Sequence, residues 1–250
     1  MEQALKLEVT LEDIHADRYG YLRPSALLYL VQEAAGKHSD LLGTDFDTLQ
    51  KKGLFWAVTR HGVTVERLPR TGERISLETW PMPASRVAYP RMVEARDENG
   101  QLLFQVLSLW VLMDVESRSM VLPGKSGVDV PGTVRGTEPE LPRSLPQVDG
   151  DRTAARTVTY SCLDRNGHMN NTRYLDWVDD LAGSEFHRKN RLTGFTVCYL
   201  SEAREGDRLA VSWTLSDGVL QADVRRENTD EHPGKHRIFG ARMIYSEEIM

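Results

Sequence analysis

One stretch of this 250-residue chain decides both its predicted fold and its candidate chemistry: Asp164-Arg165-Asn166-Gly167-His168-Met169-Asn170-Asn171. It brings a carboxylate, an imidazole and three amides into eight residues. Apolar residues recur at i, i+3, i+4 and i+7 from Tyr174 onward, so a helix is predicted over 172–187, with Asn171 or Thr172 as its cap. A helix N-terminus offers free amides and a positive partial charge. The polar cluster is therefore placed to stabilise an oxyanion in a transition state.

The part of the chain before this stretch predicts a strand, one long helix and a run of strands. Alternating apolar residues predict a strand over 5–13. Pro24 and Ser25 open a predicted helix, and Gly43 ends it. Period-two patterns predict four further strands, at 55–65, 75–80, 88–94 and 103–113. Short turns separate these strands, which favours antiparallel pairing.

The same order of elements returns after residue 150. Strands are predicted at 157–162, 195–202, 208–215, 219–225 and 238–245, with the helix over 172–187 after the first of them. A shift of 147 residues places Asp17-Arg18-Tyr19-Gly20-Tyr21-Leu22 on the segment 164–169. The sequence therefore predicts an internal duplication. Tyr19 and Tyr21 stand where the second half has Asn166 and His168, so we expect the first half to supply shape and the second to supply chemistry.

The stretch between the halves is rich in proline and glycine and lacks periodicity. It predicts an inter-domain linker that runs along the surface. The expected division is an N-terminal domain over 1–122, a linker over 123–152 and a C-terminal domain over 153–250.

Composition excludes several classes of protein. The net charge of -6 argues against a nucleic-acid partner. The polar N-terminal residues do not resemble a signal peptide, and no apolar run approaches ~20 residues, so no membrane span is expected. With Cys162 and Cys198 expected as reduced thiols, we predict a cytoplasmic protein. His232 and His236 lack a third ligand and no Gly-rich phosphate loop is present, so neither a metal nor a cofactor is predicted.

Strand, central helix and wrapping antiparallel sheet, present twice, resemble a tandem hot-dog fold. This is an α+β architecture in which two antiparallel sheets each wrap a long central helix. The polar stretch resembles the Asp-x-Asn-x-His-x-Asn-Asn motif of acyl-acyl-carrier-protein thioesterases, the plant and bacterial enzymes that release fatty acids. Their downstream Glu-Cys pair corresponds to Glu202-Ala203, and the segment 56–60 of the first half also looks like this family. The resemblance covers nearly the whole chain.

The resemblance implies hydrolysis of the thioester of fatty acyl-acyl-carrier-protein, with Asp164, Asn166, His168 and Glu202 as catalytic residues and no cofactor. Ala203 stands where the plant enzymes often carry cysteine, so a cysteine nucleophile at that place is excluded. The four residues would act on water or through a carboxylate. Either Glu202 or Asp164 could serve as base or nucleophile, and the sequence leaves this choice open.

The resemblance further implies that the first hot dog binds the acyl chain and that acyl carrier protein is the partner. Leu27, Leu30, Val31, Trp56, Val58 and Trp110 are candidates for an apolar slot. Because acyl carrier protein is acidic, its dock should be basic, and the candidates for it are Arg60, Arg67, Arg70, Arg86 and Arg91.

Two alternative functions stay open. One is an acyl-CoA thioesterase, since single hot-dog enzymes share an Asp-x-x-Gly-His-x-Asn-Asn pattern; the fused tandem and Glu202 argue against it. The other is a non-catalytic acyl-binding protein, which would not need an imidazole and a carboxylate together. A dehydratase would leave Asn166 and Glu202 without a role. The oligomeric state is open, a homodimer included.

Overall fold

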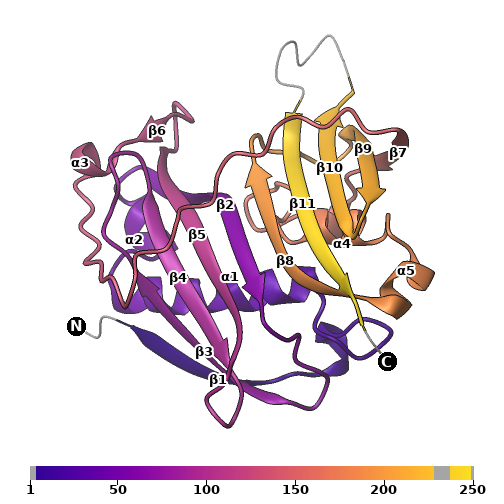
Figure 1. Cartoon of the computed structure of the whole chain (residues 1–250). Coiled ribbons are helices and arrows are strands. Elements are labelled where there is room, and N and C mark those ends of the chain that lie inside the picture. Colours follow the sequence, from indigo (N-terminus) through magenta and orange to yellow (C-terminus); the bar gives the residue numbers. More distant parts are fainter. Residues whose placement is uncertain (1–3, 228–236, 249–250) are drawn as a thin grey trace. The chain divides into compact units, whose positions relative to one another are not determined.

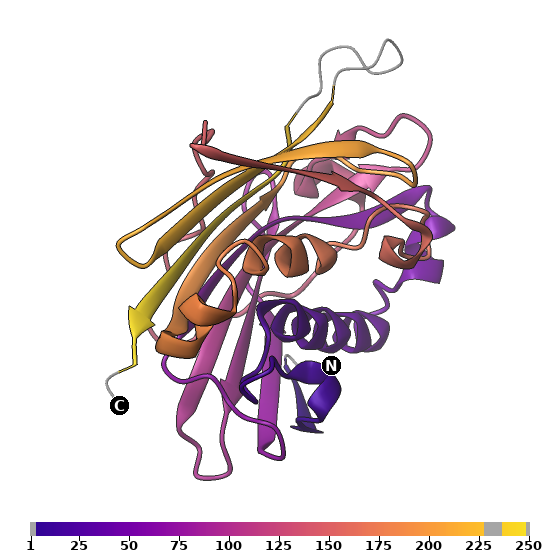
Figure 2. The same cartoon turned by 90° about the vertical axis from the view of Figure 1, so that its right-hand side faces the viewer.

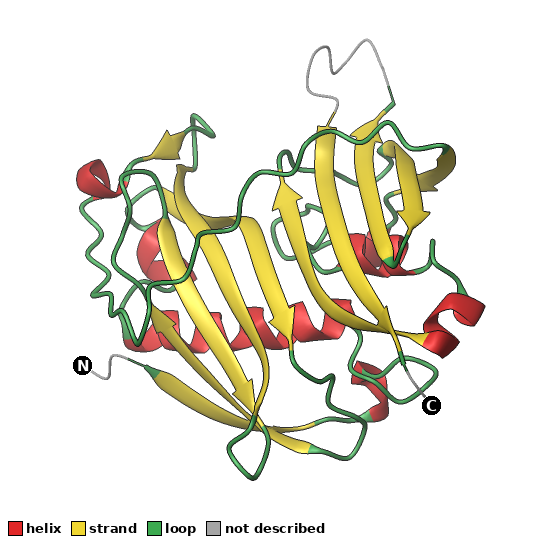
Figure 3. Ribbon diagram, in the orientation of Figure 1, coloured by secondary structure: helices red, strands yellow, loops and turns green. Residues whose placement is uncertain are grey.

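The computed structural model describes residues 4–227 and 237–248. They fall into two compact units (Figure 1). The first comprises the described residues of 1–23 and 27–143, and the second those of 24–26 and 144–250. In each unit an antiparallel sheet carries helical segments on one face (Figure 3). Among the residues described, no helix is both long and apolar enough to cross a membrane.

The sheet of the first unit has the strand order β1-β3-β4-β5-β2, with the short β6 beside β5. Its strands are β1 (Leu5–Thr10), β2 (Leu54–Val65), β3 (Arg74–Pro81), β4 (Tyr89–Arg96), β5 (Leu102–Asp114) and β6 (Met120–Val121). Neighbouring strands pair antiparallel, as the short turns predicted. The four strands predicted for β2 to β5 are confirmed within two residues at each end. The strand predicted over 5–13 ends at Thr10, because Asp13–His15 forms a 3-10 turn.

One long helix crosses the first sheet, and its predicted limits are confirmed. Helix α1 (Pro24–Leu41) begins at Pro24 and is followed by Gly43, whose φ of +65° suits glycine. Leu27, Leu28 and Val31 are fully buried, and α1 lies over one face of the sheet (Figure 2). Two short helices were not predicted: α2 (Phe46–Gln50) and α3 (Pro123–Ser126).

The sheet of the second unit has the strand order β8-β11-β10-β9-β7. Its strands are β7 (Arg152–Thr157), β8 (Asn190–Tyr199), β9 (Arg208–Ser216), β10 (Val219–Arg226) and β11 (Arg237–Glu247). The strand predicted over 157–162 is wrong, because β7 ends at Thr157 and Tyr160–Cys162 forms a 3-10 turn. The turn matches the one after β1.

The single helix predicted over 172–187 is also wrong. Two short helices occupy this region, α4 (Arg173–Asp179) and α5 (Ser184–Lys189). Gly183 lies between them with a φ of +77°, a left-handed conformation that interrupts a right-handed helix. The second sheet is therefore covered by a broken helix and not by a long central one. Tyr174 of α4 stacks on Phe239 of β11 at 4.8 Å between ring centroids, which fixes α4 on the sheet.

The two units repeat the same backbone hydrogen bonds, which confirms the tandem hot-dog fold. Leu22 N donates to Pro69 O at 2.9 Å, and Met169 N donates to Ala203 O at 2.8 Å. The donors differ by the predicted shift of 147 residues. The acceptors differ by 134, since the helical region of the second unit is shorter.

The predicted linker makes specific contacts with both units. Gly132 lies so close to Met82 that an added Cβ would stand 2.2 Å from its carbonyl carbon. In the second unit, Arg237 donates to Leu145 O at 3.0 Å and to Pro146 O at 2.9 Å. The Arg237 guanidinium is itself held by Asp223, which is fully buried. The hydrogen bonds from Arg237 to the carbonyls of Leu145 and Pro146 thus fix this part of the predicted linker on the second unit.

Candidate active site

His168 and Glu202 meet in the second unit. His168 Nε2 lies 3.1 Å from Glu202 Oε2. The His168 side chain is 14% exposed and that of Glu202 is 42% exposed, so the pair is reached by solvent from the glutamate side. Glu202 lies beyond the end of β8 at Tyr199, in a loop over 200–207 that we call the Glu202 loop. It was predicted at a strand end, and the loop places it three residues farther on.

The segment 164–169, here the His168 loop, is a tight turn closed by its own carboxylate. Asp164 Oδ1 accepts hydrogen bonds from Asn166 N at 2.8 Å and from His168 N at 3.2 Å. Asp164 N donates to His168 O at 2.8 Å. Gly167 has a φ of +74°, which a residue with a side chain adopts only under strain. One oxygen of Asp164 is thus used to shape the loop that presents His168.

Backbone pairing joins the His168 loop to the Glu202 loop. Met169 N donates to Ala203 O at 2.8 Å, and His168 and Arg204 form an antiparallel β-bridge. Ala203 is buried, so this contact is shielded from water. The pairing brings Glu202 to His168 although the two residues are 34 positions apart in the sequence.

The amides of the motif are used at several places. Asn166 lies at the exposed tip of the His168 loop. Asn170 Oδ1 accepts from Thr172 N at 2.9 Å and from Thr172 Oγ1 at 2.8 Å. Asn171 O accepts from the hydroxyl of Tyr199 at 3.1 Å. Burial raises the pKa of Tyr199 well above its ordinary value, so this hydroxyl stays a neutral donor.

Three amides at the start of the second helix, which were expected to be free, already have partners. Thr172 precedes α4, but its side chain makes no capping bond. Thr172 N is already bonded to Asn170 Oδ1, and Arg173 N donates to Asn170 O at 3.0 Å. Leu175 N donates to Thr172 O at 3.1 Å. Asn170 of the motif therefore occupies two of these three amides.

Sequence reasoning missed two charged residues that hold the Glu202 loop. Arg226, at the end of β10, donates from Nη2 to Glu202 O at 2.6 Å and to Asp207 Oδ2 at 2.9 Å. Neither Asp207 nor Arg226 was among the predicted site residues. No local motif marks them, since they are 19 positions apart and the antiparallel β9–β10 pair brings them together.

The two cysteines lie in different elements of the second unit, and the backbone carbonyl of Cys162 accepts from Asn170 N at 2.8 Å. Cys198 is buried in β8, as the strand pattern predicted, and Cys162 lies at the end of a 3-10 turn and not in a strand. Neither forms a disulfide bond within the described residues. Among the described residues, no group of three or more His, Cys, Asp or Glu could hold a metal ion. His232 and His236 lie outside the described residues.

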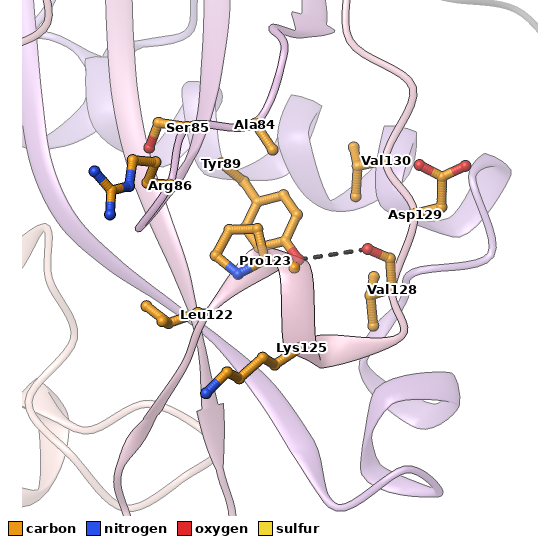
Figure 4. Close-up of a pocket in the computed structure, with 11 residues that line it drawn as sticks. Ala84, Ser85, Arg86, Tyr89, Leu122, Pro123, Lys125, Val128, Asp129 and Val130 are labelled. Carbon is orange, nitrogen blue, oxygen red and sulfur yellow. Dashed lines mark hydrogen bonds between the residues drawn. The ribbon is translucent and has the colours of Figure 1, made fainter.

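The six residues predicted for an acyl slot belong to the core of the first unit. Leu27, Leu30, Val31 and Val58 are buried, while Trp56 and Trp110 are half-buried beside Leu49 and Tyr89. A separate pocket of about 650 Å³ opens in this unit (Figure 4). None of the six lines it. Its lining is Ala84, Ser85, Arg86, Tyr89, Leu122, Pro123, Gly124, Lys125, Val128, Asp129 and Val130.

Arg91, one of the five arginines predicted to bind acyl carrier protein, is not on the surface. Arg91 is 7% exposed, with Nη1 lying 3.0 Å from His38 Nδ1 and donating to Thr79 Oγ1 at 3.1 Å. Burial lowers the pKa of Arg91 to about 10. This arginine lies in the core because its stem is part of the inner face of β4, so its assignment to a docking surface is wrong.

The other four arginines are at least partly exposed. Arg67 forms a two-bond pair with Glu73, at 2.8 Å for each bond. Arg70 lies 4.3 Å from the ring centroid of Tyr21, and Arg60 donates to Pro142 O at 3.3 Å. Arg86 is on the rim of the pocket. The structure thus leaves Arg86 as the member of the set that is exposed beside a cavity.

Known proteins match the chain along most of its length. A dodecanoyl-[acyl-carrier-protein] hydrolase of Cinnamomum camphora is 27% identical over 234 residues, which cover 87% of this chain and 61% of the relative. A palmitoyl-acyl carrier protein thioesterase of Arabidopsis thaliana is 29% identical over 206 residues, 76% of this chain and 49% of the relative. The chain thus spans about half to three fifths of the length of these relatives.

Solved structures share the fold. An acyl-ACP thioesterase from Bacteroides thetaiotaomicron matches with a TM-score of 0.83 and 23% identity, over 98% of both chains. The 12:0-ACP thioesterase from Umbellularia californica matches with a TM-score of 0.82 and 22% identity, over 99% of both chains. The family model of the acyl-ACP thioesterase N-terminal domain matches residues 4–122, and that of the C-terminal domain matches residues 147–241. Because these two models cover most of its length, the chain belongs to the acyl-ACP thioesterase family.

Proposed function

We propose that the chain hydrolyses the thioester of fatty acyl-acyl-carrier-protein, releasing a free fatty acid and the carrier protein. The observation that carries this proposal is the 3.1 Å contact between His168 Nε2 and Glu202 Oε2 at the family motif. Membership of the family and the names of the relatives supply the substrate class.

The reaction needs a nucleophile, a base and a proton for the departing sulfur. A water molecule held against the His168–Glu202 pair loses a proton to the pair while its oxygen bonds to the thioester carbonyl carbon. The tetrahedral intermediate then breaks its carbon–sulfur bond, and the same proton passes to the sulfur, which leaves as a thiol. Such positioned acid–base catalysis contributes about 10²–10⁴-fold in rate. Neither free cysteine is needed.

The two remaining motif residues take different roles. Asp164 acts as a positioning residue, since its Oδ1 bonds the two amides that shape the His168 loop. This favours Glu202 over Asp164 as the carboxylate of the reacting pair. Asn166, at the exposed tip, is placed to donate a hydrogen bond to the substrate.

Further parts of the proposal rest on the sequence. Acyl carrier protein is the partner, and the first repeat binds the acyl chain, as the resemblance implies. The absence of a disulfide between Cys162 and Cys198 supports the expectation of a cytoplasmic protein. A homodimer remains a prediction, with the oligomeric state to be measured in solution.

The test is a panel of dodecanoyl and hexadecanoyl thioesters of acyl carrier protein and of coenzyme A, monitored for free thiol. Wild type is compared with His168→Ala and Glu202→Ala. We expect faster turnover of the carrier-protein thioesters and a loss of about 10²-fold or more in each variant. Faster turnover of the coenzyme A thioesters would make the chain an acyl-CoA thioesterase. Binding of acyl chains without turnover would make it a binding protein.

A further inference from the structure

The backbone of the Glu202 loop is held by an ion pair that is largely shielded from solvent. Asp207 Oδ2 accepts from Arg226 Nη2 at 2.9 Å and from Arg226 Nε at 3.2 Å. The same oxygen accepts from Arg204 N at 2.9 Å. The side chains of Arg226 and Asp207 are only 10% and 14% exposed. A pair this well shielded, with geometry fixed by several hydrogen bonds, orders its surroundings more firmly than a surface pair does.

The guanidinium also reaches the residue that contacts the imidazole. Arg226 Nη2 donates to Glu202 O at 2.6 Å. Glu202 lies outside any strand, so sheet hydrogen bonds do not fix its own carbonyl. The bond from Arg226 adds a fixed point at the Glu202 carbonyl, between the backbone bonds of Ser201 and Ala203, and so helps to set the place where the carboxylate meets His168.

The first unit repeats one half of this arrangement and lacks the other. Glu73 Oε1 accepts from Arg70 N at 3.0 Å, as Asp207 accepts from Arg204 N. Its arginine, however, is Arg67, from the connection between β2 and β3. The place in the first unit that matches Arg226 is occupied by Asp97, which closes a hairpin turn. At this register position, one beyond Arg96 at the end of β4, the repeat that carries the His–Glu pair has an arginine and the other repeat has an aspartate.

We propose that Arg226 is a positioning residue for catalysis, held by Asp207 and acting through the backbone of Glu202. This inference rests on the proposed function. A lysine in its place offers one point charge and cannot bond Asp207 and Glu202 O with a planar fork. Loss of the fork should therefore displace Glu202 from His168 while the sheet remains folded.

The first experiment measures kcat and KM on a dodecanoyl-acyl-carrier-protein thioester for Arg226→Lys, Arg226→Met and Asp207→Asn. We expect kcat to fall by about 3–10-fold in the lysine variant and by about 10–100-fold in the methionine variant. KM should stay within about threefold of wild type. Arg208→Met is the matched control, since Arg208 pairs with Glu227 nearby and is 74% exposed. Glu73→Gln is the control in the first unit. Both should keep kcat within about twofold of wild type.

The second experiment repeats Arg226→Met and Arg226→Lys in a Glu202→Ala background. If Arg226 acts through Glu202, its substitution has no further effect there, because the group it positions is gone. An equal fold-loss in both backgrounds would overturn the inference while leaving the proposed function intact. Full activity of Glu202→Ala itself would instead overturn the proposed function. Should Arg226→Met fail to fold, the lysine variant decides, and an unchanged kcat in it contradicts the proposal.

Discussion

The loops over 17–22 and 164–169 have the same backbone and different chemistry. Asp17 Oδ1 accepts from Tyr19 N at 2.8 Å and from Tyr21 N at 2.9 Å, as Asp164 does in the second loop. Gly20 and Gly167 both have positive φ, at +81° and +74°. The turn is therefore specified by an aspartate and by a glycine three residues later, whatever side chains lie between them.

The side chains presented by the two loops separate them. Tyr21 of the first loop corresponds to His168 of the second. Tyr21 accepts a hydrogen bond from Arg70, whereas His168 contacts Glu202. Leu68 is buried at the place that corresponds to Glu202. With Tyr19 in place of Asn166, three positions thus distinguish the first unit from the one that carries the candidate catalytic residues. The difference teaches that this scaffold holds its geometry independently of the chemistry placed on it.

Exchange of the loop residue should give the largest effect. His168→Tyr, which installs the residue of the first loop, removes the imidazole, so kcat/KM on acyl-acyl-carrier-protein should fall by about 10²–10⁴-fold. Thermal unfolding should change little, because the same turn accommodates tyrosine in the first unit. Tyr21→Phe is the matched control and should keep kcat/KM within about twofold. Turnover by His168→Tyr within threefold of wild type would remove the imidazole from the mechanism.

A second contrast lies in the sheets, where Glu94 of β4 and Asp223 of β10 occupy matching places. Glu94 is 23% exposed and pairs with Arg96, whereas Asp223 is fully buried against Arg237. Asp223→Ala should lower the free energy of unfolding by about 2–3 kcal/mol, since it removes the charge-assisted hydrogen bonds that Arg237 and Val148 N donate to this buried carboxylate. Glu94→Ala should cost about 0–1 kcal/mol. Urea unfolding at pH 7 measures both, and equal losses would contradict this account of the buried pair.

A third contrast concerns His61 of β2, which occupies the place of Phe195 in β8. His61 is fully buried, and its Nδ1 forms a hydrogen bond with Ser108 Oγ at 2.8 Å. Burial lowers the pKa of His61 from 6.5 to about 3. At a pH between about 3 and 6.5, His61 binds a proton in the unfolded chain and not in the folded chain. Stability is therefore fully present above pH 6.5 and falls as the pH drops toward 3.

At pH 5 this single group should lower the free energy of unfolding by about 2 kcal/mol relative to pH 7. His61→Phe should reduce the slope of stability against pH between 6.5 and 4, as followed by urea unfolding at several pH values. Phe195→Leu, which leaves the histidine in place, should keep the slope of wild type. An unchanged slope in His61→Phe would show that another group titrates in this window.

The aspartates of the two loops should give the smallest effects. Asp164→Ala and Asp17→Ala each lose two hydrogen bonds to backbone amides, at about 0.5–1.5 kcal/mol for each bond. Asp164→Asn and Asp17→Asn keep an accepting oxygen and should restore most of that stability. Because Asp164 acts on the loop, Asp164→Asn should retain kcat within about fivefold. A loss of 10²-fold in the asparagine variant, with stability unchanged, would make Asp164 the reacting carboxylate.

Much of this fold could be predicted from local patterns. Period-two alternation located β2 to β5 within two residues, and Pro24 and Gly43 located α1. The duplicated turn located the second repeat. The broken helix was missed because apolar spacing continued through the segment, and only the backbone conformation of Gly183 shows the break.

The candidate site was predictable only in part. Asp164 to Asn171 are contiguous, so a motif could mark them, whereas Glu202 was found through a family resemblance. Arg226 and Asp207 could not be found, since strand pairing alone brings them to the Glu202 loop. Arg91 was assigned to the surface because charge suggests exposure, and the buried contact with His38 depends on packing that the sequence does not display.

The most direct test of the account is a double-mutant cycle on the pair itself. kcat/KM on dodecanoyl-acyl-carrier-protein is measured for wild type, His168→Ala, Glu202→Gln and the double variant. If the two side chains work as one unit across their 3.1 Å contact, kcat/KM falls by about 10²–10⁴-fold in each single variant. The kcat/KM of the double variant then lies at most about threefold below that of the less active single variant. Losses that multiply in the double variant, or single variants as active as wild type, would contradict a joint role for His168 and Glu202.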